Sequence, residues 1–282
     1  MTTVAAALAA ARAKLPASEV RLLLGHVLER SAVWLVAHDD EALDEDALLA
    51  FASLVARRGG GEPVAYLLGY REFFGRRFAV NSAVLIPRPE TELLVELALA
   101  RVGAGNTANI LDLGTGSGCI AITLALELPR ARVTAVDSSS AALEVAAGNA
   151  LALGASLRLV QGDWFTGLAG ERFDLIVSNP PYVAAADAHL AGGDLRHEPL
   201  QALASGADGL DAIRIIAAQA QQHIMPNGVL LIEHGYDQAG AVRRLMGAAG
   251  FSDITGHPDI AGVLRVTTGK FGRIDEASAN SR

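Results

Sequence analysis

The chain of 282 residues contains one cysteine, Cys119, so no disulfide framework can form within it. Its seven histidines show no spacing typical of a metal site, and no metal is expected. Near its start, the longest apolar stretch is residues 4–11, which is far too short to cross a bilayer. The chain also lacks the G-x-x-x-x-G-K-S/T sequence of a P-loop. These absences argue against a disulfide-stabilised, metal-binding, membrane-spanning or P-loop protein, and the single cysteine suits a reducing compartment.

The net charge and the hydrophobic content of the chain further narrow the class of protein. The net charge is −8, and such an acidic chain does not favour the broad basic surface that nucleic-acid binding requires. A modest cluster of arginines is nevertheless present: Arg57, Arg58, Arg71, Arg76, Arg77 and Arg88. Hydrophobic residues make up 51% of the chain, which supports a large core and makes disorder unexpected.

The first 60 residues have the pattern of a small helical bundle. Helices are predicted at residues 4–13, 18–27, 31–37 and 44–58. Three polar residues can cap the later helices: Ser18, Ser31 and Asp44. Consecutive glycines at 59–61 end this region. Residues 64–80 predict a β-hairpin within a linker that spans residues 61–88.

From Asn109 onward, apolar strands alternate with helices, which predicts an α/β domain with a parallel sheet over residues 89–270. After the strand that begins at Asn109, further strands are predicted at residues 132–136, 156–160, 173–178, 228–233, 251–255 and 262–268. The last strand is expected to be antiparallel, which makes a seven-stranded sheet. Residues 271–282 are polar and aperiodic, and they predict a flexible tail.

The most informative short sequence is Asn179-Pro180-Pro181-Tyr182, directly after the strand predicted at residues 173–178. Two prolines permit neither helix nor sheet pairing, so they fix an extended turn where open α/β sheets bind ligands. The Asn179 side-chain oxygen and the Pro180 carbonyl are acceptors, and Tyr182 offers a flat ring. Together they suit a planar NH2 group. An ordinary proline-rich loop is the alternative for this tetrapeptide alone.

A glycine-rich turn, at which a ligand can approach the backbone, follows the strand that begins at Asn109. It consists of Gly114, Thr115, Gly116, Ser117 and Gly118. A dinucleotide fingerprint that starts at Gly114 needs glycine at position 119, which is Cys119 here, so NAD is disfavoured. Asp112, just before the turn, can accept from an amino-acid ammonium group, or it is a solvated carboxylate at a strand end.

Two further strand ends carry acidic residues. Asp137 can accept hydrogen bonds from two ribose hydroxyls, and it follows Asp112 by 25 residues (137 − 112), near the spacing of about 20 expected in such folds. Asp163 can accept from an exocyclic adenine amine. Trp164 either flanks the base or is a core aromatic. The four strand ends therefore offer groups for an amino-acid end, a ribose, an adenine and a reacting nitrogen. This set resembles the class I S-adenosylmethionine methyltransferases that methylate amino groups.

Longer matches narrow the resemblance. They are Gly-Tyr-Arg-Glu-Phe at 69–73, Leu-Ile-Pro-Arg-Pro-Glu-Thr-Glu at 85–92, Glu-Pro at 198–199, Ala-Leu at 202–203, Gly206, and Asp-Gly-Leu at 208–210. In this order, and together with the glycine turn and Asn-Pro-Pro-Tyr, they resemble the release factor glutamine methyltransferases (the HemK/PrmC family). The resemblance spans nearly the whole chain.

This resemblance implies a cytoplasmic enzyme with a Rossmann-like sheet that uses S-adenosyl-L-methionine and releases S-adenosyl-L-homocysteine. Its substrates would be class-one peptide chain release factors, methylated on the glutamine N5 of their Gly-Gly-Gln motif, which modulates translation termination. The family's cofactor positions match residues 114–118, Asp137, Trp164 and Asn179. Its glutamine-binding positions match residues 179–182.

The chemistry of the residues agrees with these implied roles. An amide nitrogen is a poor nucleophile, and the Asn179 oxygen and Pro180 carbonyl can accept its two N–H bonds and aim it at the methyl group. The same dipoles, and the face of Tyr182, stabilise the positive charge that develops on nitrogen. Asn179, Pro180 and Tyr182 are therefore the catalytic candidates. Residues 1–60 are expected to dock the release factor, or they merely cover apolar surface of the catalytic domain.

Rival functions remain open at the level of sequence. An amino methyltransferase that acts on adenine in nucleic acid can use the same tetrapeptide, but it needs a basic stripe for phosphates. A non-catalytic module that binds S-adenosylmethionine would need Asp137 and the glycines but not the intact tetrapeptide. A dehydrogenase is disfavoured by Cys119. No direct contact with nucleic acid or with a membrane is expected.

Overall fold

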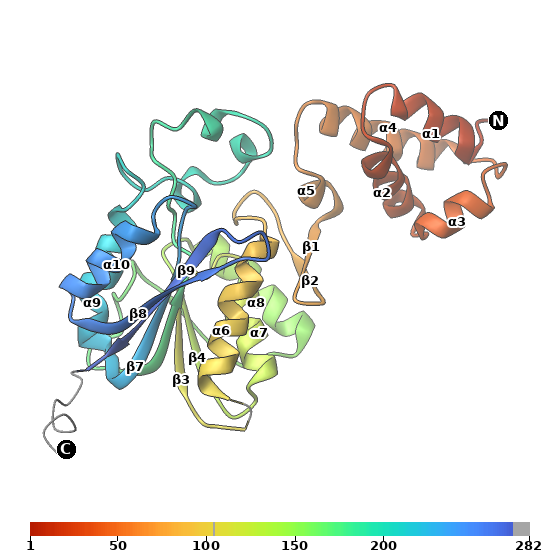
Figure 1. The fold of residues 1–282 in the computed structure, drawn as a ribbon. Coiled ribbons are helices and arrows are strands. Elements are labelled where there is room, and N and C mark those ends of the chain that lie inside the picture. Colours follow the sequence, from red (N-terminus) through yellow and green to blue (C-terminus); the bar gives the residue numbers. More distant parts are fainter. Residues whose placement is uncertain (104, 273–282) are drawn as a thin grey trace, which may run out of the picture.

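The computed structural model describes residues 1–103 and 105–272. In Figure 1 the N-terminal helices, in red and orange, stand beside a larger α/β domain, and a short hairpin lies between them. Across the described residues, no helix is long and apolar enough to span a membrane.

The N-terminal helices are α1 (Val4–Arg12), α2 (Ala17–Leu28), α3 (Ala32–Ala37) and α4 (Glu45–Gly59). Two of the predicted caps are confirmed, because Ser31 accepts from the Trp34 N–H at 3.1 Å and Asp44 accepts from the Ala47 N–H at 2.7 Å. The prediction for Ser18 is wrong, since α2 begins one residue earlier behind Pro16, whose constrained backbone starts the helix. These helices enclose a core of their own that includes Val4, Leu23, Leu24 and Phe51.

The segment predicted as a hairpin begins instead with a helix, α5 (Val64–Leu68). Pro63 precedes this helix, and Gly69, with φ of 78°, ends it in the left-handed region that glycine tolerates. Leu67 of α5 packs into the core of the N-terminal bundle. The hairpin itself is shorter than predicted: β1 (Tyr70–Phe73) pairs antiparallel with β2 (Arg76–Ala79).

The larger domain contains the predicted sheet, which has seven strands across the described residues, in the order β5-β4-β3-β6-β7-β9-β8. Their bounds are β3 (Asn109–Leu113), β4 (Arg132–Asp137), β5 (Arg158–Gln161), β6 (Phe173–Ser178), β7 (Ile224–Glu233), β8 (Phe251–Pro258) and β9 (Leu264–Phe271). The last strand is antiparallel to both β7 and β8, as predicted. The predicted tail starts too early, because Phe271 ends β9 and its ring lies 5.5 Å from that of Phe251, between centroids. The rest of the predicted tail, residues 273–282, lies outside the described residues.

Helices cover both faces of this sheet. On one face, α6 (Glu92–Val102), α7 (Cys119–Glu127) and α8 (Ser140–Leu153) enclose a large apolar core. On the other, α9 (Asp211–His223) and α10 (Ala239–Ala248) enclose a second core. A short 3-10 turn, η1 (Pro89–Thr91), precedes α6. The long connection between β6 and α9 rises above the sheet in Figure 1 and contains η2 (Ala188–Ala191), η3 (Leu195–His197) and η4 (Leu200–Ala202).

The strand order reverses between β3 and β6, because the chain runs outward from β3 through β4 to β5 and returns on the other side with β6. Leu113 pairs with Ser178, and Ser178 pairs with Ile232. The residues that follow these strands therefore meet at one edge of the sheet. This reversal is the position at which open α/β sheets bind ligands.

Candidate active site

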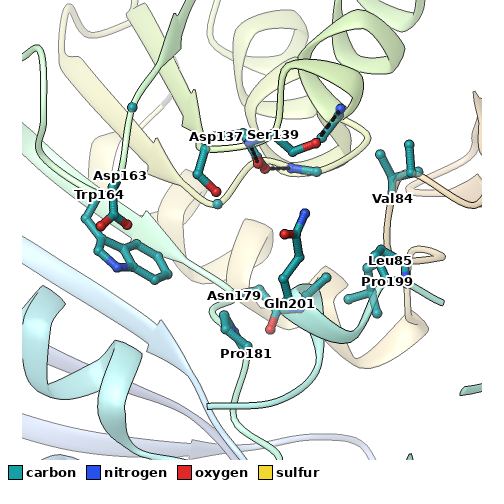
Figure 2. A pocket seen from close by; sticks show the side chains of 17 residues that line it. Val84, Leu85, Asp137, Ser139, Asp163, Trp164, Asn179, Pro181, Pro199 and Gln201 are labelled. Atoms are coloured by element: carbon teal, nitrogen blue, oxygen red, sulfur yellow. Dashed lines mark hydrogen bonds between the residues drawn. The ribbon is translucent and has the colours of Figure 1, made fainter. Parts of the chain in front are cut away.

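A cavity lies at this carboxyl edge. Its walls are formed by Ala83, Val84, Leu85, Gly114, Gly116, Asp137, Ser138, Ser139, Ala142, Gly162, Asp163, Trp164, Asn179, Pro181, Pro199, Gln201 and Ala202. Figure 2 shows Asp137 and Ser139 across the cavity from Asn179 and Pro181, with Trp164 at one end. The predicted strand ends after β3, β4, β5 and β6 therefore come together in one site.

The glycine turn brings backbone to the cavity wall. Gly114, Gly116 and Gly118 have φ of 73°, 55° and 81°, which side chains rarely adopt. A Cβ on Gly118 would lie 3.2 Å from the Cβ of Ala146 in α8, so this glycine also allows the start of α7 to lie close to α8. Gly114 and Gly116 line the cavity, whereas Gly118 does not, and the side chains of Thr115 and Ser117 are buried. The turn thus presents bare backbone to a ligand.

Asp137 braces the turn and faces the cavity. Its Oδ2 accepts from the Gly116 N–H at 2.9 Å, and its Oδ1 accepts from the Ser139 N–H at 2.9 Å. Each carboxylate oxygen keeps a further lone pair that can accept a hydroxyl. Ser139 caps α8 by accepting from the Ala142 N–H at 3.2 Å. The carboxylate is therefore held in place before any ligand binds.

Asp163 and Trp164 form the end of the cavity beyond the glycine turn. Trp164 has φ of 51°, an uncommon value for a residue with a side chain. A Cβ on Gly114 would lie 3.7 Å from the Trp164 ring, so the indole packs beside the turn. The ring is partly buried against the second core and also lines the cavity, so contact with the adenine stays a prediction.

Asp112 lies beneath the turn rather than in the cavity wall. It is fully buried, its Oδ2 accepts from the Thr115 hydroxyl at 2.6 Å, and its Oδ1 has no partner among the described residues. Burial raises the pKa of Asp112 to about 7. The alternative of a solvated carboxylate is therefore wrong. Direct contact with an ammonium group stays a prediction that this geometry does not display.

The tetrapeptide divides into two parts. Asn179 and Pro181 line the cavity, while Pro180 is buried and Tyr182 packs against the second core. The Asn179 Nδ2 donates to the Thr91 hydroxyl at 3.0 Å, which leaves Oδ1 to accept from a ligand. Burial raises the pKa of the Tyr182 hydroxyl, and the main-chain oxygen of Tyr182 accepts from Gln238 at 2.9 Å. The Tyr182 ring, expected to offer a flat face to the substrate, is thus half-buried against the core, and its contact with the substrate stays a prediction.

The rest of the cavity wall consists of residues that the sequence analysis did not predict individually. It is formed by two segments of the chain, one with Val84 and Leu85 and the other with Pro199, Gln201 and Ala202. Gln201 extends its carboxamide into the cavity in Figure 2. The buried Glu198 carboxylate joins these two segments, because it accepts from the Ile86 N–H at 3.0 Å and pairs with Arg88. Most of these residues lie in or beside the family matches at 85–92, 198–199 and 202–203, and these matches were the signal in the sequence that could have indicated them.

Comparisons with known proteins agree with this fold. The model of the methyltransferase small domain matches residues 89–207, and the model of the PrmC N-terminal domain matches residues 1–69. A solved methyltransferase from Pyrococcus furiosus shares the fold with a TM-score of 0.55 and 19% identity, covering 79% of this chain and 100% of its own. A 16S rRNA methyltransferase from T. thermophilus, solved with AdoMet and guanosine, has a TM-score of 0.53 and 20% identity over 72% of this chain and 50% of its own. Fold and site together define an S-adenosylmethionine-dependent methyltransferase.

Comparison with curated relatives shows to which family of methyltransferases the chain belongs. The release factor glutamine methyltransferase of Bordetella pertussis is 52% identical over 256 residues, which cover 90% of this chain and 95% of the relative. That of Burkholderia pseudomallei is 50% identical over 263 residues, covering 91% and 92%. The chain belongs to the family of release factor glutamine methyltransferases.

Proposed function

We propose that this protein transfers the methyl group of S-adenosyl-L-methionine to the side-chain N5 of the glutamine in the Gly-Gly-Gln motif of class-one peptide chain release factors. The observation that carries the proposal is the Asn179 amide, fixed through its Nδ2 by Thr91 at the wall of the cavity. Relatives that are about half identical over nearly their whole length support this choice of substrate. The action modulates translation termination and belongs in the cytoplasm.

The cavity fits the cofactor. Bare backbone at Gly114 and Gly116 suits the amino-acid portion, the Asp137 carboxylate suits the ribose hydroxyls, and Asp163 with Trp164 suits the adenine. When bound, the cofactor supplies an electrophilic methyl group on a sulfonium. Its cationic centre is compatible with the two acidic side chains in the wall.

The substrate end of the site is formed by Asn179, Pro180 and Pro181. The Asn179 Oδ1 and the Pro180 carbonyl accept the two N–H bonds of the glutamine amide and direct its nitrogen toward the methyl group. Positive charge grows on that nitrogen during transfer, and fixed acceptor dipoles stabilise it. Tyr182 contributes by anchoring the turn, since its ring packs in the core and its main-chain oxygen is held by Gln238.

The helical bundle docks the body of the release factor. Its core consists of its own residues and those of α5, which supports a role beyond covering the sheet domain. It leaves large apolar side chains exposed on α2, α3 and α4: Leu22, Val33, Val36 and Leu49. Arg58 of α4 pairs with Asp194 of the long connection at 2.7 Å, and Arg196 donates to the Gly60 carbonyl. Binding energy from contacts between the bundle and the release factor, far from the reacting atoms, can thereby position the loop that carries the glutamine.

The test is transfer of labelled methyl from S-adenosylmethionine to a purified release factor, to the same factor with its motif glutamine changed to alanine, and to ribosomal RNA or DNA. Label on the first substrate alone supports the proposal. Label on nucleic acid would establish the rival adenine methyltransferase. Cofactor binding without transfer to any substrate would establish a binding module.

A further inference from the structure

A buried asparagine, Asn149, lies within α8 and does not line the cavity. Its residue is 2% exposed. Asparagine is a poor residue for the interior of a helix, and a buried carboxamide is costly unless its polar atoms are paired. Here the oxygen and the nitrogen of the carboxamide are both paired, with main-chain atoms of two other segments. The reason for an asparagine at this position therefore lies in those two segments.

The first segment is the end of the hairpin, at Ala79 of β2. The Asn149 Oδ1 accepts from the Ala79 N–H at 2.7 Å, and the Asn149 Nδ2 donates to the Ala79 carbonyl at 3.0 Å. The carboxamide thus pairs with both main-chain groups of one residue, as a neighbouring β-strand can do. Shortly after Ala79, the same stretch of chain reaches the cavity wall at residues 83–85.

The second segment is the glycine turn. The Asn149 Nδ2 also donates to the Ser117 carbonyl at 2.8 Å. This contact is possible because Gly118 lets α8 come close, at Ala146. Ala146 and Asn149 lie about one helical turn apart on the same face of α8. The Asp137 carboxylate braces the same turn at a different peptide group.

Apolar packing attaches the same stretch after the hairpin to the same helix. Val80 and Val84 are buried against Ala142 of α8. The Tyr66 hydroxyl of α5 also donates to the Val84 carbonyl at 2.7 Å. Both Val84 and Ala142 line the cavity. One helix therefore contacts two parts of the cavity wall, the glycine turn and the stretch at residues 83–85, and Asn149 bonds to the first and just ahead of the second.

We propose that Asn149 is a positioning residue for the cofactor: its carboxamide fixes the glycine turn and the end of the hairpin relative to each other. Both parts of the wall are then in place before S-adenosylmethionine binds. A site that is fixed in advance loses less conformational entropy when its ligand binds. Without the carboxamide, main-chain groups of Ala79 and Ser117 lose their partner, and the two segments can move apart. This inference rests on the proposed function, because it takes the cofactor as the ligand of the cavity.

The first arm of the test measures the dissociation constant of S-adenosylhomocysteine by calorimetric titration in wild type, Asn149→Ala and Asn149→Asp. Asn149→Asp keeps the shape of the side chain and an acceptor for the Ala79 N–H, but it loses both donors. If the unbraced turn holds its binding conformation for about a tenth of the time, the dissociation constant rises about tenfold. We expect a rise of this size in both variants. An affinity within about twofold of the wild-type value in both folded variants would overturn the proposal.

A control variant, Ile216→Ala, separates positioning from a general loss of stability. Ile216 is a fully buried residue of α9, on the face of the sheet opposite α8, and it does not line the cavity. Its truncation should lower the midpoint of urea unfolding, because it leaves a void in the core. The dissociation constant should stay within about twofold of the wild-type value. An equal rise in Ile216→Ala and Asn149→Ala would show that affinity only follows stability, and it would overturn the proposal.

The second arm uses hydrogen–deuterium exchange and does not depend on methyl transfer. Without ligand, the amides of residues 114–118 should exchange faster in Asn149→Asp than in wild type or in Ile216→Ala, because the turn has lost a brace. Unchanged exchange at these residues would overturn the proposal. If the wild-type protein binds no S-adenosylhomocysteine, the proposed function fails, and this comparison still decides whether Asn149 holds the turn.

The wild-type protein supplies a measurement that needs no variant to fold. When S-adenosylhomocysteine binds at the turn, the Ala79 amide should exchange more slowly, although Ala79 does not line the cavity. Asn149 is the contact that joins this amide to the turn. If neither Asn149 variant folds, slower exchange at Ala79 supports the proposal, and exchange that the ligand leaves unchanged overturns it.

Discussion

The Asp137 carboxylate accepts a hydrogen bond from the Gly116 main-chain N–H at 2.9 Å, so the predicted ribose acceptor also holds the glycine turn. The two parts of the cofactor cavity that come from β3 and β4 are therefore coupled. A substitution at Asp137 should affect both the ribose contact and the turn.

Asp137→Ala should weaken binding of S-adenosylmethionine by at least about tenfold, because it removes charge-assisted acceptors. Calorimetric titration measures the dissociation constant directly. Glu144→Ala is the matched control, since Glu144 is an exposed acid on the helix that follows Asp137. Unchanged affinity in Asp137→Ala would mean that the ribose lies elsewhere.

Asn179→Ala should lower the rate of methyl transfer by about 10²–10³, the effect of losing one preorganised polar group. Cofactor affinity should fall much less, because other wall residues remain. Single-turnover kinetics at saturating cofactor separates the two effects. A rate near that of the wild-type protein would remove Asn179 from the mechanism.

Docking by the helical bundle is tested with full-length variants. Val33 and Val36 of α3 are 78% and 69% exposed, so Val33→Asp with Val36→Asp should leave the fold intact. The value of kcat/KM should fall by about tenfold or more with the intact release factor but not with a short Gly-Gly-Gln peptide, because only the former gains from remote contacts. Leu151→Asp, at an exposed position of α8, serves as the control. Equal losses on both substrates would contradict the docking role.

Stability should depend on the ionisation of Glu233. Burial raises its pKa in the folded protein from 4.5 to about 7, so between these values the folded state holds a proton that the unfolded state has lost. The favourable contribution is complete below pH 4.5, and it is lost as the pH rises through 7. Glu233→Gln has no such dependence, so its free energy of unfolding should increase relative to wild type across this range.

Urea unfolding of both proteins at several pH values measures that difference. Asp112, whose pKa is also raised to about 7, adds the same slope to both proteins and cancels in the comparison. Parallel curves of stability against pH would show that Glu233 does not titrate in this window.

Much of this protein could be predicted without its structure. The alternation of apolar strands and helices indicated the seven-stranded sheet and its antiparallel last strand, and Ser31 and Asp44 marked helix starts by local capping chemistry. The carboxyl ends of parallel strands share one edge, so Asp137, Asp163 and Asn179 could be placed near one another from their positions in the chain alone.

Tertiary structure alone decided the contacts between distant segments. Thr91 meets Asn179 across 88 positions of sequence, and Glu198 meets the Ile86 N–H across 112, which no local pattern encodes. Burial of Asp112 and the inward packing of Tyr182 depended on which elements cover each strand end. A motif determines which chemical groups are available in this protein. The packing of remote segments determines the direction in which each group points and the free-energy cost of its charge in that environment.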